Sequence, residues 1–517
     1  MLDVPSAARQ LAPSAWRAAA ARPLDRESLC AALAEQNRRW QAGPATAAAI
    51  ERLRDPKTVA VVTGQQAGLF GGPALTAWKI LTSIRLAEQL QRQGQPAAPV
   101  FWIASEDHDF EEARQTTILT RDGKLLAIAC RPAFDGQPSV GAIRLDAAAT
   151  ASLAQLSDAL PHSDFAPDLL RRLGACYRPG HGWCDAFAMW LHEMFAPFGL
   201  IILDPRDARL RALTQSTFES VIDLMPSVME RLLRQARNWR ASGKTPQVNI
   251  RENATPLFLE IEGRRTALLS DGQSFYPKSN PESRYTSREL LHILRDAPLR
   301  ITPNALLRPV IQDQLLPTVA QVVGPAEAAY LEQSRLIYEA LQLAPPARWP
   351  RASVTLVEKR HAKLLSKLAL VPEDIFLGSQ ALLRRAALAS ADKQALDAFE
   401  RVKTTIEGEL DRLQGALRAS DSSLADALHR GREKIFHQIS GLEQRFLANQ
   451  AQRQEALARQ LERATDALAP YGKPQERALN LLSFLVKYGP GLIGRVYERI
   501  RLDTDEHQWL AVEPEVA

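Results

Sequence analysis

The first part of the chain alternates short apolar runs with helical stripes of apolar residues. The β-branched run Thr58–Thr63 predicts a buried strand, and it ends in a glycine-rich loop over residues 64–73. Apolar positions that share one broad helical face predict a helix over residues 74–91, and the run Pro99–Ala104 predicts a second strand. Strand, loop, helix and strand in this order form a βαβ unit, whose strands pair in parallel through a right-handed crossover.

The same order returns further along the chain. A helical pattern around Asp185–Phe195 precedes a strand pattern over Gly199–Leu203. Repeated units of this kind predict an α/β fold with a Rossmann-like, doubly wound parallel sheet as its core. Residues 243–269 carry shorter strand signals separated by turns, which predict an antiparallel insertion. Helical patterns then follow over residues 304–323 and 325–341.

A long α-helical coiled coil is predicted from Asp392 onward, where apolar residues recur every three or four positions between charged and amide side chains. The pattern includes Phe399, Val402, Ile406, Leu410, Leu413, Leu417, Leu424, Leu428, Ile435, Ile439, Leu442 and Phe446. Residues 420–423 could cap a second helix and favour a hairpin, although the spacing also permits one continuous rod. We therefore expect a core over residues 1–375, a coiled coil over 376–470, and a C-terminal segment, 471–517, that packs back onto the core.

Composition places the chain among soluble globular proteins. Of its 517 residues, 46% are hydrophobic and 24% are charged, and no apolar run reaches the roughly 18 residues that a membrane-spanning helix needs. The four cysteines form no CxxC pair, and the N-terminus has no continuous apolar segment. We therefore expect a reduced, cytoplasmic protein that does not associate with a membrane.

The charge balance favours small anionic substrates as much as nucleic acid. The net charge of +5 comes from 64 basic and 59 acidic residues. The sequence has no basic run interleaved with aromatic residues and no zinc-finger or RNP pattern, so we expect no nucleic-acid partner.

The glycine-rich loop is the first candidate binding site. Its backbone N–H groups and the helix start behind it would favour an anion, although a tight strand-to-helix turn explains the glycines equally well. The spacing GxxxGxxGG is neither the dinucleotide fingerprint nor a Walker A loop. The adjacent side-chain amides of Gln65 and Gln66 favour a binding site over a simple turn. The candidate residues are Gly64, Gln65, Gln66, Gly68, Gly71, Gly72 and, in the following helix, Lys79.

An ionisable cluster follows the second predicted strand directly, at Glu106, Asp107, His108 and Asp109. It would lie at the carboxyl edge of the sheet, where doubly wound folds bind ligands, beside the glycine-rich loop. Neighbouring carboxylates raise one another's pKa, so such a group can move protons near neutral pH. Asp107, His108 and Asp109 could instead hold magnesium or manganese, and a solvated acidic loop is the third interpretation.

A third cluster presents polar side chains at helical spacing. Asn304, Arg308 and Gln312 lie at i, i+4 and i+8, and Asp313 follows them. Pro309 interrupts that face, so the helix could begin there. The guanidinium of Arg308 is a candidate clamp for a carboxylate or phosphate.

Several other polar residues are interpreted as structural. Glu327 lies in the first turn of a predicted helix and is assigned to capping, and Tyr330 is assigned to core packing. Isolated histidines such as His192 are interpreted as structural. The sequence lacks a GxSxG elbow and a Cys–His pair with an orienting acid, which argues against covalent hydrolase chemistry.

Ordered sequence blocks along nearly the whole chain resemble those of one known family. The most specific are TGQQAGLFGGP, PVFWIASEDHDFEEA, PNALLRPVIQDQLLPT and VVGPAEAAY. On these blocks the chain resembles the cysteine ligases of bacillithiol biosynthesis, the BshC family. One departure is Leu75, where the family often has a tyrosine, so a role for that hydroxyl cannot be carried over.

The resemblance implies a Rossmann-like core with helical inserts and a long coiled coil through which two chains form a homodimer. It implies addition of L-cysteine to the amine of glucosaminyl-malate, the last step in making bacillithiol. The family is also associated with an adenine nucleotide, ADP or ATP, in a second pocket. Here Gln475, Glu476, Arg477 and Asn480 would border it. Consumption of that nucleotide and a need for a divalent metal stay open.

For that reaction we expect the glycine-rich loop to hold an anion, either a nucleotide phosphate or the malate carboxylates, with charge added by Arg308 and Lys79. Asp107, His108 or Asp109 would accept the amine proton or hold a metal. Two other classes of function stay open: an adenylating or nucleotidyl-transferring enzyme with another substrate, and a coiled-coil scaffold without enzymatic activity.

Overall fold

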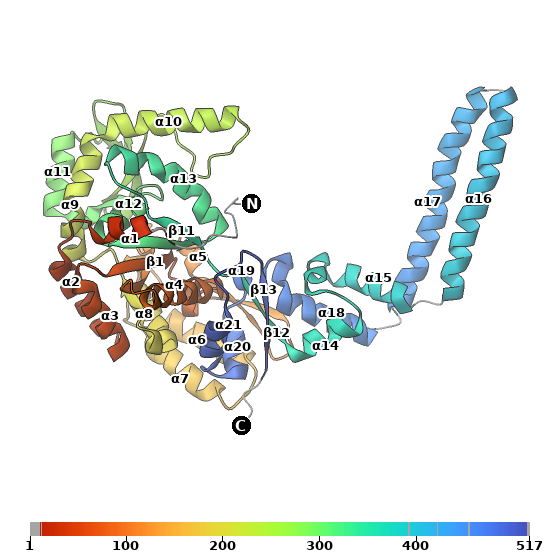
Figure 1. Cartoon of the computed structure of the whole chain (residues 1–517), viewed down its shortest axis with the longest axis horizontal. Coiled ribbons are helices and arrows are strands. Elements are labelled where there is room, and N and C mark those ends of the chain that lie inside the picture. The colour runs from red at the N-terminus through yellow and green to blue at the C-terminus, as the bar shows by residue number, and fades with distance from the viewer. Residues whose placement is uncertain (1–10, 12, 391–392, 421, 453–454, 514–517) are drawn as a thin grey trace. The chain divides into compact units, whose positions relative to one another are not determined.

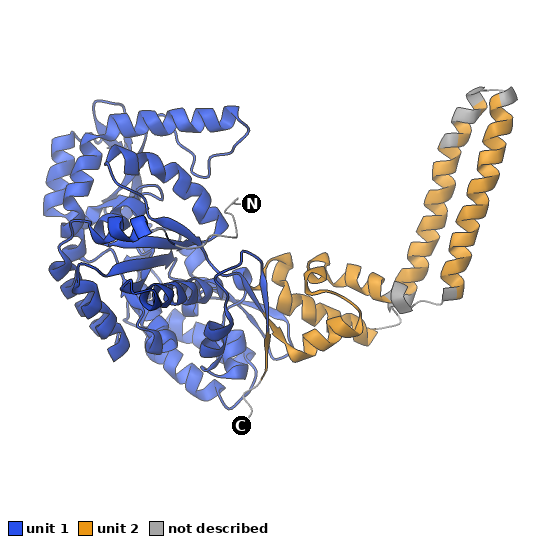
Figure 2. Cartoon of the chain, viewed as in Figure 1, with its two compact units in different colours: residues 1–355, 476–510, 514–517 blue, residues 356–475, 511–513 orange. Residues whose placement is uncertain are grey.

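The computed structural model describes residues 11, 13–390, 393–420, 422–452 and 455–513. The chain divides into two compact units (Figure 2). The first contains the chain up to residue 355 together with residues 476–510, and the second contains residues 356–475 and 511–513. The first unit holds the central sheet, and the second holds the long helices.

The first unit is built around a five-stranded parallel sheet with the strand order β11-β10-β1-β2-β5 (Figure 1). Its strands are β1 (Val59–Gln65), β2 (Ala97–Ile103), β5 (Ile201–Leu203), β10 (Thr318–Val323) and β11 (Ala347–Pro350). From β1 the chain moves outward through β2 to β5, and it then continues on the other side of β1 with β10 and β11. This reversal confirms the predicted doubly wound sheet and puts the topological switch point between β1 and β10.

Helices cover both faces of this sheet. The helices of the first unit include α1 (Pro13–Ala20), α2 (Arg26–Arg39), α3 (Pro44–Arg54), α4 (Leu75–Arg92), α5 (Phe110–Ala113), α6 (Ala147–Ala159), α7 (Ala166–Cys176), α8 (Trp183–Phe195), α9 (Ala208–Asp223), α10 (Met225–Ala241), α11 (Ser287–Asp296), α12 (Arg308–Leu315), α13 (Pro325–Ala340), α20 (Leu482–Tyr488) and α21 (Leu492–Arg499). Because side chains alternate along a strand, Ala60 and Val62 share one core with α2 and α3, while Val59 and Val61 share another with α1 and α4. All four side chains are fully buried, as the apolar run Thr58–Thr63 predicts.

The predicted helix over residues 304–323 is wrong in its second half. The structure has the short helix α12 over Arg308–Leu315, and the chain then forms β10, the neighbour of β1 in the sheet. The sequence of β10, TVAQVV, is rich in β-branched residues and is buried on both faces, and Pro317 separates it from α12. Periodicity alone does not distinguish such a short buried run from the end of a helix.

The predicted antiparallel insertion is present, and the strand signals at residues 257–261 and 266–269 lie in observed strands. Its sheet has the order β8-β7-β6-β9 and consists of β6 (Ala254–Ile261), β7 (Arg264–Ser270), β8 (Phe275–Pro277) and β9 (Ile301–Pro303). The expected strand at residues 248–250 is not formed. Since β9 ends shortly before α12, the insertion leads directly to the switch point. Two smaller pairs complete the sheets, β3 (Gln115–Leu119) with β4 (Leu125–Ala129), and β12 (Val354–Glu358) with β13 (Gln508–Val512).

The second unit contains a helical hairpin. Its main helices are α14 (Lys359–Lys367), α15 (Ser379–Ser390), α16 (Lys393–Ser420), α17 (Ser422–Gln452) and α18 (Glu455–Leu468), and α19 (Gln475–Ala478) begins at its end. Lys403 Nζ lies 2.8 Å from Glu443 Oε2, and Arg432 lies 2.6 Å from Asp411 Oδ1, so α16 and α17 run antiparallel (Figure 1). The alternative of one continuous rod is therefore wrong. The proposed cap includes Asp421, which is outside the described residues. Within the described part of the chain, no helix is both long and apolar enough to cross a membrane.

His192 on α8 is buried, and its Nε2 lies 3.0 Å from Asn37 Oδ1. Burial lowers the pKa of His192 to about 4, whereas an unfolded histidine titrates near pH 6.5. Protons therefore bind preferentially to the unfolded chain as the pH falls through this window. We expect His192 to lower the free energy of unfolding by about 3 kcal/mol as the pH falls from 6.5 to 4. Above pH 6.5, His192 should not change the free energy of unfolding with pH.

Chemical denaturation of the first unit across this pH range measures the effect. The variant His192→Gln should lose this part of the pH dependence, whereas His292→Gln, at an exposed position, should keep it. Equal pH profiles for the wild type and His192→Gln would contradict the assignment.

Candidate functional site

The loops after β1 and β2 meet at the carboxyl edge of the sheet. Gln66 Nε2 donates a hydrogen bond to Asp107 Oδ2 at 2.5 Å, and the N–H of Ala104 donates to Gln65 O at 3.0 Å. The structure thus brings together the glycine-rich loop and the ionisable cluster, as the βαβ interpretation requires. Gln66 Oε1 is buried and has no hydrogen-bond partner among the described residues, so the amide is held through its nitrogen alone.

Lys79 holds the end of β1 to the start of α13. Its Nζ donates to Gly64 O at 2.6 Å, to Gln65 Oε1 at 3.2 Å and to Glu327 Oε2 at 2.7 Å. The side chain is 5% exposed, and these three bonds use all three ammonium hydrogens. This geometry does not support the predicted role of Lys79 as a direct ligand for an anion.

Arg308 lies near the other carboxylate oxygen of Glu327. Its Nη1 donates to Gln312 Oε1 at 3.1 Å, its Nη2 donates to the Tyr330 hydroxyl at 3.1 Å, and Glu327 Oε1 is 3.7 Å away. Lys79 and Arg308 carry two positive charges against the one carboxylate of Glu327, which leaves a local positive excess at the switch point. This excess is compatible with the predicted role of Arg308 toward a carboxylate or phosphate.

Tyr330 packs against Val323, Ala328 and Leu331, as predicted. Glu327 lies in the first turn of α13, also as predicted, but no side chain among the described residues caps this helix through a hydrogen bond. Both residues make further contacts at the site. The Glu327 carboxylate bridges the two cations, and the Tyr330 hydroxyl contacts both Arg308 and Glu327. Burial raises the pKa of Tyr330, which keeps its hydroxyl protonated at neutral pH. These contacts join residues far apart in the sequence, and a helix-start pattern carries no signal for them.

The rest of the third cluster supports α12 from within. Asn304 Oδ1 accepts hydrogen bonds from the N–H groups of Leu306 and Leu307, at 2.9 and 3.0 Å, so Asn304 stabilises the turn that leads into the helix. Gln312 Nε2 donates to Asp313 Oδ1 at 3.1 Å, and Asp313 also accepts from the Tyr338 hydroxyl. Burial raises the pKa of Asp313. Of the predicted polar face, Arg308 thus lies at the site, and Gln312 accepts a hydrogen bond from it.

The glycines of the loop allow close packing. An added Cβ at Gly68 would lie 2.7 Å from Gly72 Cα, and Gly71 has a φ of +93°, which L-residues rarely adopt. The N–H of Gly68 donates to Gln66 O, that of Gly71 to Gly68 O, and that of Gly72 to Leu69 O. Because these donors are used within the loop, the geometry favours a folding role for Gly68, Gly71 and Gly72 over the predicted anion cradle.

The four residues of the ionisable cluster have different surroundings. Glu106 is buried in an ion pair with Arg211, and Asp109 caps α5 by accepting from the N–H of Glu112 at 3.3 Å. The side chains of Asp107 and His108 are 39% and 40% exposed beside Gln66. Asp109 is exposed too, but of the accessible residues only Asp107 is bonded to Gln66, and His108 is its neighbour.

Asp107 remains a carboxylate at neutral pH. Burial raises its pKa, but the hydrogen bond from the backbone N–H of His108 and the charge of Arg265 act against burial, and the pKa lies well below its usual range. The His108 N–H donates to Asp107 Oδ1 at 2.7 Å, and Arg265 Nη1 lies 3.9 Å from the same oxygen. A carboxylate of this kind is suited to accepting hydrogen bonds from an amine, although its low pKa makes it a weak base.

Arg265 is a site residue that sequence reasoning missed. It comes from β7 in the antiparallel insertion, and its Nη1 lies 3.0 Å from His108 Nδ1. The two residues are 157 positions apart, and the insertion carries no motif that would indicate the contact.

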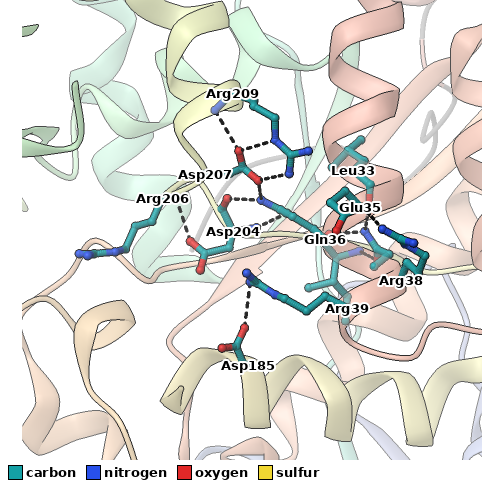
Figure 3. A network of polar contacts seen from close by, with 12 residues as sticks. Leu33, Glu35, Gln36, Arg38, Arg39, Asp185, Asp204, Arg206, Asp207 and Arg209 are labelled. Carbon is teal, nitrogen blue, oxygen red and sulfur yellow. Dashed lines mark hydrogen bonds and ion pairs between the residues drawn. The ribbon is translucent and has the colours of Figure 1, made fainter. Parts of the chain in front are cut away.

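The edge of the site beside β5 is held by a polar network around Asp204 (Figure 3). Gln36 on α2 donates to Asp204 O at 2.9 Å and accepts from the Asp204 N–H at 3.1 Å. Asp207 caps α9 and pairs with Arg209 at 2.7 Å. Ser105 donates to the Asp204 carboxyl group, whose pKa is raised by burial, and so joins the end of β2 to the end of β5. This network fixes the loop that carries Asp107 and His108.

The residues proposed to border a nucleotide are mostly engaged in internal contacts. Gln475, in the second unit, bonds the backbone of Leu356 and Ala467. In the first unit, Glu476 pairs with Arg351 at 2.5 Å and accepts from Ser353 and Val354, and Asn480 bonds Leu69, Phe70 and Thr116. Arg477 is exposed. These contacts do not fit a nucleotide site in which Gln475, Glu476 and Asn480 bind the ligand directly.

The described residues contain no group of three His, Cys, Asp or Glu side chains arranged to hold a metal ion. Asp109 accepts a hydrogen bond from the N–H of Glu112 at the start of α5. The metal interpretation of the ionisable cluster therefore finds no support in this geometry.

Comparison with known proteins gives matches over almost the whole chain. Residues 8–352 match the family described as bacillithiol biosynthesis BshC, N-terminal Rossmann-like domain, and residues 354–512 match the C-terminal coiled-coil domain of the same family. A protein from Salinibacter ruber is 36% identical over 96% of this chain and 91% of its own length. Proteins from Solibacter usitatus and Bacillus cereus are 34% and 30% identical, over 96% and 92% of this chain and 92% and 88% of their own lengths. Each of the three bears the name "Putative cysteine ligase BshC".

Proposed function

The chain belongs to the bacillithiol biosynthesis BshC family, and we propose that it is a ligase that joins L-cysteine to the amine of glucosaminyl-malate, the last step in making bacillithiol. The observation that carries the proposal concerns the residues at the end of β1, in a chain that matches both domains of the family. Gln66 bonds Asp107, which follows β2, and Lys79 links Gly64 and Gln65 to Glu327, which lies beside Arg308.

The chemistry of this edge suits the proposed substrates. Forming a C–N bond from a carboxyl group and an amine requires an activated acyl group and a deprotonated amine. In the proposal, the Asp107 carboxylate accepts a hydrogen bond from the attacking amine and orients it. The C–N bond forms as the acyl carbon of the activated cysteine releases its activating phosphate or nucleotide group, and the amine proton passes to solvent. Arg308, with its excess positive charge, attracts the malate carboxylates. The proposal includes no step through a nucleotide at Gln475, Glu476 or Asn480, because the side chains of these residues already bond other groups of the chain.

Mass spectrometry tests the reaction. Purified full-length protein, glucosaminyl-malate and L-cysteine should give a product with the mass of bacillithiol. Parallel reactions with ATP, with ADP and without nucleotide identify the activating donor. Absence of that product under all three conditions would overturn the proposal, and pyrophosphate released from ATP without cysteine would favour an adenylating enzyme instead.

We further propose that two chains associate through the hairpin of α16 and α17. Several large apolar side chains on it are exposed: Val402, Leu413, Ile435 and Leu442 are between 38% and 59% exposed. A single hairpin leaves these seam positions uncovered, and a second copy would bury them.

The free, buried state of all four cysteines agrees with the expected reducing, cytoplasmic environment.

Adding charge to this surface should separate the dimer. The double variant Leu413→Glu/Leu442→Glu is expected to change the mass measured by light scattering from that of two chains to that of one. Arg401→Glu is the matched control, since it adds a carboxylate at an exposed position of α16 outside the apolar seam. A two-chain mass for the double variant, or a one-chain mass for the wild type, would contradict this mode of association.

A further inference from the structure

The side chain of Arg265 is locked in one orientation before it reaches His108. It is 6% exposed, and its guanidinium carbon lies 3.7 Å from the centre of the Phe258 ring. Its Nε donates to Thr302 Oγ1 at 2.9 Å, and its Nη2 donates to Pro303 O at 2.9 Å. Two hydrogen bonds to β9 and stacking on β6 therefore fix the plane of the guanidinium.

The remaining nitrogen, Nη1, points to the imidazole. Arg265 Nη1 lies 3.0 Å from His108 Nδ1. Asp107 Oδ1 is farther from His108 Nδ1, at 3.4 Å. A guanidinium has N–H donors and no acceptor, so its partner must supply a lone pair. A proton on Nδ1 would face the N–H groups of Arg265 directly. In a neutral imidazole whose Nδ1 accepts this bond, the ring hydrogen is on Nε2.

We infer that Arg265 is a positioning residue that holds His108 in the Nε2–H tautomer, so that His108 donates a hydrogen bond to an oxygen of a substrate carboxyl group. The assignment of that oxygen rests on the proposed ligase function, in which both substrates carry carboxylates. The cation behind the ring strengthens the donor, and the half-exposed side chain of His108 makes it accessible. The inference also separates the roles that the sequence left open, since Nε2–H cannot accept the amine proton and Asp107 is left to orient the amine.

Nitrogen NMR reads the tautomer without any turnover. In histidine-labelled full-length protein, two-bond ¹H–¹⁵N correlations distinguish the protonated from the unprotonated ring nitrogen of His108, whose signals are identified by their loss in His108→Gln. The wild type is expected to show an unprotonated Nδ1. In Arg265→Met, which keeps an apolar stem over Phe258, Asp107 Oδ1 is the nearest partner and a signal from protonated Nδ1 should grow. Arg265→Lys restores a donor and should restore the wild-type pattern.

A protonated Nδ1 in the wild type would overturn the inference, and so would an unchanged tautomer in a folded Arg265→Met variant. Unchanged signals of the buried His192 show that this variant is folded. If the variant does not fold, the wild-type spectrum still decides between the two tautomers.

Kinetics separate a donor from a base. His108→Gln keeps an N–H donor and His108→Leu does not, so a donor role predicts a loss of kcat within about 10-fold for Gln and of about 100-fold for Leu. Equal losses for the two variants would contradict a donor role. Because the tautomer is read without substrate, failure of the ligase proposal and failure of this inference give different results.

Discussion

Replacing Lys79 by methionine is expected to lower the free energy of unfolding of the first unit by about 3 kcal/mol. The substitution keeps the length of the side chain and removes the ammonium, so Glu327 is left as a largely buried carboxylate beside the ends of β1 and β10. Gly64 O and Gln65 Oε1 lose a donor at the same time. Arg308, 3.7 Å from Glu327, still compensates part of the charge, and the loss should therefore lie at the low end for a broken buried pair. Urea denaturation monitored by tryptophan fluorescence measures it.

A double-mutant cycle tests the physical cause. Adding Glu327→Gln to Lys79→Met should recover part of the loss, because the uncompensated carboxylate is removed. The matched control is Arg92→Met on the same helix α4, since Arg92 pairs with Glu88 at 3.4 Å while 78% exposed. It should cost less than about 1 kcal/mol. If the losses of Lys79→Met and Glu327→Gln add fully in the double variant, Lys79 and Glu327 do not act as a unit.

The βαβ unit was predictable because its signals are local. A β-branched strand, a loop whose glycines meet one another and a helix with one apolar face lie next to each other in the sequence. The same locality explains the convergence of Gln66 with Asp107, since the crossover between two adjacent parallel strands brings both loops to one edge. The long helices of the second unit were predictable from their heptad pattern for a similar reason, but that pattern permitted either a hairpin or one continuous rod.

The parts of the site that were missed depend on contacts between distant segments. Glu327 contacts Lys79 because β10 pairs with β1, and the strand β10 itself resembled the end of a helix in its pattern. Arg265 reaches His108 only because the antiparallel insertion folds back beside β2. Conversely, Glu106 and Asp109 have the residue type expected of a catalytic group, but their contacts are structural. Glu106 pairs with the buried Arg211, and Asp109 caps α5. Residue type and position in the sequence do not show which carboxylates acquire such partners.

Asp107→Asn is expected to lower kcat/KM of the proposed ligase reaction by about 100-fold, the low end of the range for groups that assist proton transfer. The effect is limited because the lowered pKa of Asp107 makes its carboxylate a weak base, so that most of its contribution comes from orienting the amine. The isosteric amide can keep the bond to Gln66 only through its remaining oxygen, and it loses the charge that attracts an amine. Steady-state kinetics with glucosaminyl-malate and L-cysteine measure this loss.

Asp109→Asn is the matched control, because it makes the same chemical change two residues away. Asparagine is as good a cap as aspartate, so this variant should retain kcat/KM within about threefold and lose less than about 1 kcal/mol of stability. If the two variants lose activity equally, the site extends to the start of α5 and Asp107 has no special role. If neither loses activity, the loops after β1 and β2 bind no reacting group, and the active site must be sought elsewhere on this chain.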